Sequence, residues 1–67
     1  MIYQPGTKVK IVSLTPYDIQ FHPELNVGDV GTVVSANEFF TDIFEVEFNG
    51  EKYNMEYSQL TQVKEEE

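Results

Sequence analysis

The dipeptide Asn49-Gly50 constrains the fold more than any other feature, because it lies between two segments of alternating apolar and polar residues. Both central positions of a type I′ turn need a positive φ angle, which asparagine and glycine tolerate. A two-residue turn also sets the register of the hairpin. That register pairs Phe48 with Glu51, Glu47 with Lys52, Val46 with Tyr53, Glu45 with Asn54 and Phe44 with Met55. One face of the hairpin is then apolar and the other polar, so the sequence predicts an antiparallel hairpin with one buried face.

Three further strands are predicted around this hairpin. Val9 and Ile11 alternate with two lysines, as in a half-buried strand. Gly28 and Gly31 flank the start of another strand and indicate a bulge or a close backbone approach. We expect strands at roughly 7–14, 30–37, 42–49, 51–57 and 61–64, with a 3₁₀ turn near 57–60. The expected core is Val9, Ile11, Val33, Phe44, Val46, Phe48, Met55, Leu60 and Val63.

Residues 15–28 form the longest connection that the sequence predicts. Two prolines interrupt it, and its apolar residues follow no clean period. A loop of this length is unusual in so small a domain and is often functional. With one core for 67 residues, we expect a single domain over 1–64 and a disordered acidic tail over 65–67.

Taken together, these segments resemble an SH3-like barrel. The segment Gly28-Asp29-Val30-Gly31-Thr32-Val33 is similar to the glycine-centred motif of KOW-type barrels. With the start Pro5-Gly6-Thr7-Lys8-Val9, it also resembles small uncharacterised SH3-like proteins of bacteriophages and prophages. The resemblance implies an all-β fold, a small five-stranded antiparallel SH3-like barrel with a short 3₁₀ turn before the last strand. Unlike SH3 domains that bind proline-rich peptides, this chain has no tryptophan.

The charge of the chain limits its partners. Twelve acidic residues face four lysines, for a formal net charge of −8, and there is no cysteine. Such a chain is repelled by phosphate backbones and anionic lipids, so we expect a protein partner, with a basic surface, rather than nucleic acid or a membrane. The alternative is that the charge serves only solubility. No signal peptide or membrane span is recognisable, and the resemblance implies the cytoplasm of a bacterial host.

Aromatic side chains in two loops are the candidate contacts for a partner. In an SH3-like barrel the 15–28 loop borders the groove where ligands lie, and large rigid side chains bind at low entropic cost. The alternative is that Tyr17 or Phe21 folds back over a small core. Phe39 and Phe40 are neighbours that point opposite ways in an extended chain, so we expect one of them to be exposed. The predicted partner-binding residues are Tyr17, Phe21, His22, Phe39, Phe40 and Tyr57, with Asp18, Glu38 and Asp42 in the surrounding acidic rim.

No catalytic, cofactor or metal site is expected. His22 is the sole histidine, and Asp18 and Glu24 nearby do not complete a metal site. The serines lie in no nucleophile motif. Three functions remain open: a non-enzymatic protein-interaction module, such as a phage or prophage accessory protein that binds a host or phage protein; a KOW-type barrel associated with nucleic acid or ribosomes; and a structural subunit of a larger assembly. The sequence leaves the oligomeric state open.

The surplus of acidic residues predicts how stability responds to salt. Repulsion among carboxylates strains a small fold at low ionic strength, and added salt screens it. We therefore expect the melting temperature to rise as sodium chloride is added up to physiological strength, measured by circular dichroism. A clear fall over the same range would contradict this prediction.

Overall fold

The computed structural model of the chain describes residues 3–36 and 42–64. It is an all-β fold, a small barrel formed by one antiparallel sheet in the order β4-β3-β2-β1-β5. The strands are β1 (Lys8–Ile11), β2 (Val30–Ala36), β3 (Ile43–Phe48), β4 (Glu51–Glu56) and β5 (Leu60–Gln62). The 3₁₀ turn η1 (Tyr57–Gln59) immediately precedes β5, which confirms the predicted fold class. The expected acidic tail at 65–67 lies outside the described residues.

The β3–β4 hairpin has the predicted register. Phe48 faces Glu51, Val46 faces Tyr53 and Phe44 faces Met55, with the polar pairs between them. The φ angles of Asn49 and Gly50 are 53° and 85°, as a type I′ turn requires. The turn residues therefore determine which face of the hairpin enters the core.

Gly31 allows β2 to lie very close to its neighbour β3. A Cβ atom at this position would lie 2.5 Å from the carbonyl oxygen of Glu47 and 2.7 Å from the ring of Phe48. Farther along β2, the register shifts between Val33 and Ser35, which marks a bulge. Close approaches and bulges of this kind bend a small sheet around its core.

The core matches the prediction except at two positions, Val63 and Leu25. Val63 was expected inside but is only half-buried, because β5 ends at Gln62 and is an edge strand with a neighbour on one side alone. Leu25, from the long connection, is buried instead. The buried apolar side chains are Val9, Ile11, Leu25, Val33, Phe44, Val46, Phe48, Met55 and Leu60.

The connection between β1 and β2 contains a short helix, α1 (Pro16–Phe21), which the apolar pattern of the sequence did not predict. Thr15 is its N-cap: the Thr15 hydroxyl accepts a hydrogen bond from the backbone of Asp18, and the Asp18 carboxylate accepts one from the backbone of Thr15. This capping box, with Pro16 at the first helical position, was the readable signal in the sequence. Six residues are too few for an amphipathic period to show.

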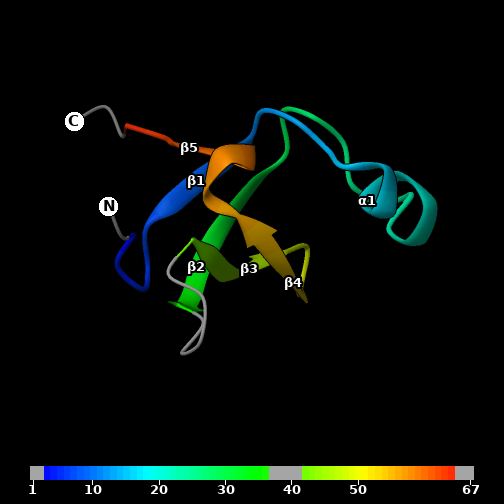
Figure 1. Cartoon of the computed structure of the whole chain (residues 1–67). Helices are drawn as coiled ribbons and strands as arrows, with labels where there is room; N and C mark the ends of the chain where they lie inside the picture. The colour runs from blue at the N-terminus through cyan, green and yellow to red at the C-terminus, as the bar shows by residue number, and fades with distance from the viewer. Residues whose placement is uncertain (1–2, 37–41, 65–67) are drawn as a thin grey trace.

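The helix lies at one side of the barrel, away from both ends of the chain (Figure 1). Backbone hydrogen bonds close the base of the loop that carries it: Gly28 donates to Ile11 and Ile11 donates to Asp29. The loop therefore leaves the sheet after Ile11 and returns to it beside the same residue. Its tip, which contains α1, lies against a different part of the barrel.

Replacing Gly31 with alanine tests the close approach of β2 to β3. The new methyl group meets backbone, which cannot move aside as a flexible side chain can, so we expect a loss of ~1–3 kcal/mol in the free energy of unfolding. Urea denaturation of Gly31→Ala measures it. The neighbouring Thr32→Ala is the matched control, and equal stability of the glycine variant and the wild type would refute the close approach.

Candidate functional site

Three apolar side chains of α1 face solvent. Tyr17, Ile19 and Phe21 are 62%, 62% and 56% exposed, although they are large. The rings of Tyr17 and Phe21 lie one helical turn apart, with their centroids separated by 4.7 Å. Neither ring folds back over the core; from this loop, Leu25 is the apolar side chain that is buried in it. The two predicted aromatic residues therefore form an exposed ledge on the helix.

His22, also a predicted site residue, joins this ledge to β4. It is half-buried, and its ring lies 5.8 Å from that of Tyr17 and 5.0 Å from that of Tyr53 on β4. The Tyr53 hydroxyl in turn donates a hydrogen bond of 2.5 Å to Oε2 of Glu24. This bond raises the pKa of Tyr53 to about 12 and lowers the pKa of Glu24. The residues that follow α1 are thus attached to β4 by a ring contact and by a hydrogen bond.

Asp18 does not lie on an acidic rim as predicted. It is only 4% exposed, because the capping box turns its carboxylate inward beneath α1. There Oδ2 accepts hydrogen bonds from the backbone and hydroxyl of Thr15 and from Nε2 of Gln59, the last at 2.7 Å. The same Nε2 donates to the carbonyl of Ser13, and Oε1 of Gln59 accepts from the backbone of Glu56. Gln59 therefore ties α1 to η1.

The balance of burial and hydrogen bonding decides the charge of Asp18. Burial alone raises the pKa of this carboxyl group, but the hydrogen bonds from Gln59 and Thr15, with a smaller contribution from His22, outweigh burial and lower the pKa below its ordinary value. Asp18 is consequently ionised at neutral pH, with negative charge held beneath the helix.

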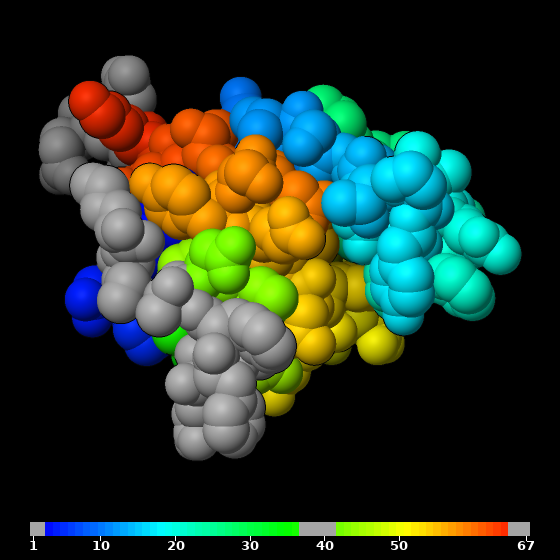
Figure 2. Space-filling view, viewed as in Figure 1, coloured from blue at the N-terminus to red at the C-terminus, as the bar shows by residue number. Residues whose placement is uncertain are grey.

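An open pocket of about 190 Å³ lies between α1 and the edge of the sheet. On one side it is bordered by the start of α1 and on the other by β4, the start of β3 and η1. These elements lie side by side on the face shown in Figure 2, with α1 in cyan and the end of β4 with η1 in orange. The lining residues are Thr15, Tyr17, Asp18, Ile43, Asn54, Met55, Glu56 and Gln59.

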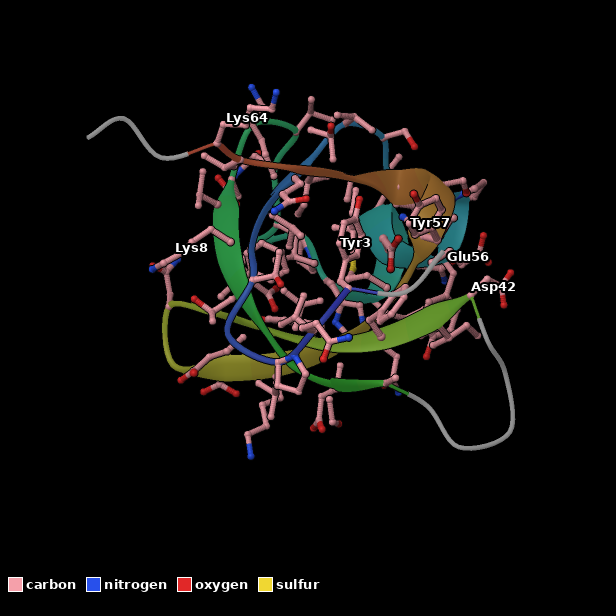
Figure 3. The ribbon with its side chains drawn as sticks, turned by 90° about the vertical axis from the view of Figure 1, so that its left-hand side faces the viewer. Tyr3, Lys8, Asp42, Glu56, Tyr57 and Lys64 are labelled. Atoms are coloured by element: carbon pink, nitrogen blue, oxygen red, sulfur yellow. The ribbon has the colours of Figure 1, made fainter. Side chains whose placement is uncertain are left out.

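The remaining predicted residues belong to another group. Tyr57 packs its ring at 5.1 Å from Tyr3 and 6.2 Å from Phe44, rather than on the aromatic residues of α1. Asp42 is exposed beside it, and its carbonyl accepts a hydrogen bond from the backbone of Tyr57 (Figure 3). The predicted single surface is therefore divided, with the pocket between its two parts. Glu38, Phe39 and Phe40 lie outside the described residues.

In the sequence, positive charge is confined to residues outside the loop that carries α1. No lysine or arginine occurs between Lys10 and Lys52 in the sequence, a stretch that includes the whole loop carrying the helix. Figure 3 shows Lys8 and Lys64 on one side of the barrel and Asp42 and Glu56 on the other. The pocket, bordered by Asp18 and Glu56, thus lies in a region of negative potential.

Sequence reasoning found the aromatic residues but missed the groups that position them. Gln59 and Tyr53 act through contacts with residues far away in the sequence, at separations of 41 and 29 residues. No local pattern indicates such pairs. Among residues 3–36 and 42–64, no three or more histidine, aspartate or glutamate side chains are grouped to hold a metal ion, and no helix is long and apolar enough to cross a membrane.

Comparisons of the chain with protein-family models, with curated proteins and with solved structures gave no match. A function for this chain is therefore inferred from the geometry of the pocket and of the α1 ledge.

The Asp18–Gln59 hydrogen bond predicts a pH-dependent stability. Because the pKa of Asp18 is lower in the folded state than in the unfolded chain, its contribution is present above pH ~4 and is lost as the pH falls through the folded-state pKa. At pH 7 we expect Asp18→Asn to lower the free energy of unfolding by ~1–2 kcal/mol, because a charged acceptor is replaced by a neutral one.

The measurement is urea denaturation of both proteins between pH 7 and pH 2.5. The difference between them should shrink as the pH falls. Glu51→Gln is the control, because Glu51 is exposed. A difference that stays constant with pH would show that Asp18 contributes through its shape and not through its charge.

Proposed function

We propose that this protein is a non-enzymatic interaction module that binds a basic region of another protein through α1 and the adjoining edge of β4. The observation that carries the proposal is the exposed ledge of Tyr17 and Phe21, on a helix whose buried Asp18 is hydrogen-bonded to Gln59. A small acidic protein gains nothing in solubility from three large apolar side chains on one short helix. Binding accounts for their position.

The fixed position of α1 favours binding energetically. Rigid aromatic side chains lose little conformational freedom when a partner covers them, and they dominate the affinity of many interfaces. Here the capping box, the hydrogen bond from Gln59 and the contact between His22 and Tyr53 order the helix before any partner arrives. The partner does not have to supply that ordering free energy.

The charge distribution supports a basic partner. Glu24 and Glu56 are exposed beside the ledge and the pocket, and the loop that carries α1 has no cation. Such a field speeds encounter with positively charged surfaces and disfavours acidic ones. In a bacterial cell infected by a phage or carrying a prophage, a host or phage protein with a basic surface is the kind of partner we propose.

Nucleic-acid binding is the second candidate, and it depends on different residues. Lys8 and Lys10 project from the outer face of β1, where both are exposed. Two lysines release only about two counterions from a phosphate backbone, which is too few to overcome a net charge of −8.

A comparison of variants in affinity purification tests the proposal. The tagged full chain, expressed in the bacterial host, is compared with Tyr17→Ala/Phe21→Ala by quantitative mass spectrometry. We expect the double variant to recover at least ~10-fold less of the specific partner, because two anchors of about 1–2 kcal/mol each are lost.

Val27→Ala/Val30→Ala is the matched control. It removes two apolar side chains that are about as exposed as Tyr17 and Phe21 but do not belong to α1. Thermal melts establish that both variants fold. If the tyrosine and phenylalanine variant recovers the same partner as the wild type, while Lys8→Glu/Lys10→Glu loses it, the binding face is β1 and the second candidate is favoured.

A further inference from the structure

Strand β4 is at the edge of the sheet, so half of its backbone groups have no partner strand. In an antiparallel hairpin closed by a two-residue turn, the pair that flanks the turn is hydrogen-bonded, and bonded and non-bonded pairs then alternate. Phe48 and Glu51 flank the turn. The backbone N–H and C=O groups of Lys52, Asn54 and Glu56 therefore point away from β3, toward the free edge.

Two hydrogen bonds elsewhere agree with this alternation. Val33 directs its backbone toward the β1 side, donating to Thr7 and accepting from Gly6, so its neighbour Thr32 faces β3. Thr32 pairs with Glu47, so the backbone groups of Glu47 point toward β2. The backbone groups of Lys52, which pairs with Glu47 on β4, therefore point toward the free edge. At the far end, the outward N–H of Glu56 donates to the side chain of Gln59. The backbone of Asn54 has no such cap among the described residues.

The pocket lies along this part of the edge. Asn54, Met55 and Glu56 form one of its borders, and Tyr17 and Asp18 form the other. Its volume of about 190 Å³ is below the ~300–1,000 Å³ typical of small-molecule sites. The space suits a side chain of an added peptide better than a free cofactor.

Asp18 provides the second observation. All the hydrogen bonds that its carboxylate accepts reach Oδ2, from Thr15 and Gln59. No described residue donates to Oδ1, and no fully buried side-chain polar atom in the described chain lacks a partner. Because Asp18 lines the pocket, Oδ1 is the oxygen of its carboxylate that is left to accept a hydrogen bond from a cationic group placed there.

We propose that an extended, lysine- or arginine-bearing segment of the partner protein adds to the free edge of β4 at Asn54 and places its cationic head group at Oδ1 of Asp18. The proposal rests on the proposed function and specifies how the partner is bound. Backbone hydrogen bonds to Asn54 supply affinity for any extended chain, and the charge in the pocket selects among side chains. Tyr17 and Glu56 lie on opposite borders of the pocket. The Tyr17 ring can contact the cationic side chain of the partner, and the Glu56 carboxylate adds negative charge opposite it.

Position 54 allows a variant that separates backbone from side chain. Asn54→Pro removes the outward N–H and leaves the hydrogen bonds to β3 in place. Edge strands tolerate proline at such a position. Asn54→Ala changes the side chain and keeps the N–H. The probe is the capped peptide Thr-Val-Lys-Val-Thr, titrated into the ¹⁵N-labelled full chain by NMR. We expect the amide of Asn54 to shift in the wild type, and the proline variant to bind about tenfold more weakly than the alanine variant, which keeps the N–H.

The peptide itself supplies a test that does not depend on the folding of a variant. It is N-methylated at one backbone amide at a time. Strand addition predicts that affinity falls about tenfold at alternate positions and stays within about twofold at the others, because alternate amides face β4. Replacing its lysine with glutamate should weaken binding by at least tenfold.

A loss of affinity that is the same at every methylated position, or no binding at millimolar peptide, would overturn strand addition. Equal binding of the lysine and glutamate peptides would overturn the cationic specificity. Either result leaves the proposed function intact if Tyr17→Ala/Phe21→Ala still loses the partner in affinity purification. If that variant also keeps its partner, the proposed function fails as well.

Discussion

The hydrogen bond from Gln59 to Asp18 is the interaction on which the candidate surface depends. It is 2.7 Å long, it is buried, and it joins residues separated by 41 positions in the sequence. Without it, α1 would be a six-residue helix on a long loop, far too short to be stable alone. With it, the start of the helix is attached to η1, and the next residues, through His22 and Glu24, are attached to Tyr53 on β4. The exposed rings and the pocket both depend on these attachments.

The sheet provides the frame for that interaction. The hairpin turn at Asn49-Gly50 sets which backbone groups of β4 face outward, and the close approach at Gly31 lets β2 bend beside β3. Because β4 is an edge strand, the loop that carries α1 can lie beside it rather than over a neighbouring strand. The edge of β4 and the aromatic ledge of α1 thus border one pocket, and the two lysines labelled in Figure 3, Lys8 and Lys64, lie on the other side of the barrel from Glu56.

The sequence predicts correctly those features that depend on residues close together in the chain. Alternation and turn chemistry were enough for the strand order of the hairpin, its register and almost the whole core. Prediction failed where contacts between residues distant in the sequence determine whether a side chain is buried. Val63 was placed in the core as part of the predicted last strand, but the edge position of β5 leaves it half-buried. Asp18 was placed in the acidic rim of the predicted surface, but its three hydrogen bonds make burial possible. Leu25 lies in a segment without a period, where nothing local marks it as buried.

Amide hydrogen exchange across α1 tests most directly whether the Asp18–Gln59 hydrogen bond holds the surface together. The amides of Ile19 and His22 donate to the carbonyls of Thr15 and Asp18, so their exchange reports on the helix. We predict that both are protected in the wild type and lose most of that protection in Gln59→Ala, whereas the amides of the β3–β4 hairpin keep theirs. Unprotected amides in the wild type, or undiminished protection in the variant, would contradict a surface that depends on this hydrogen bond.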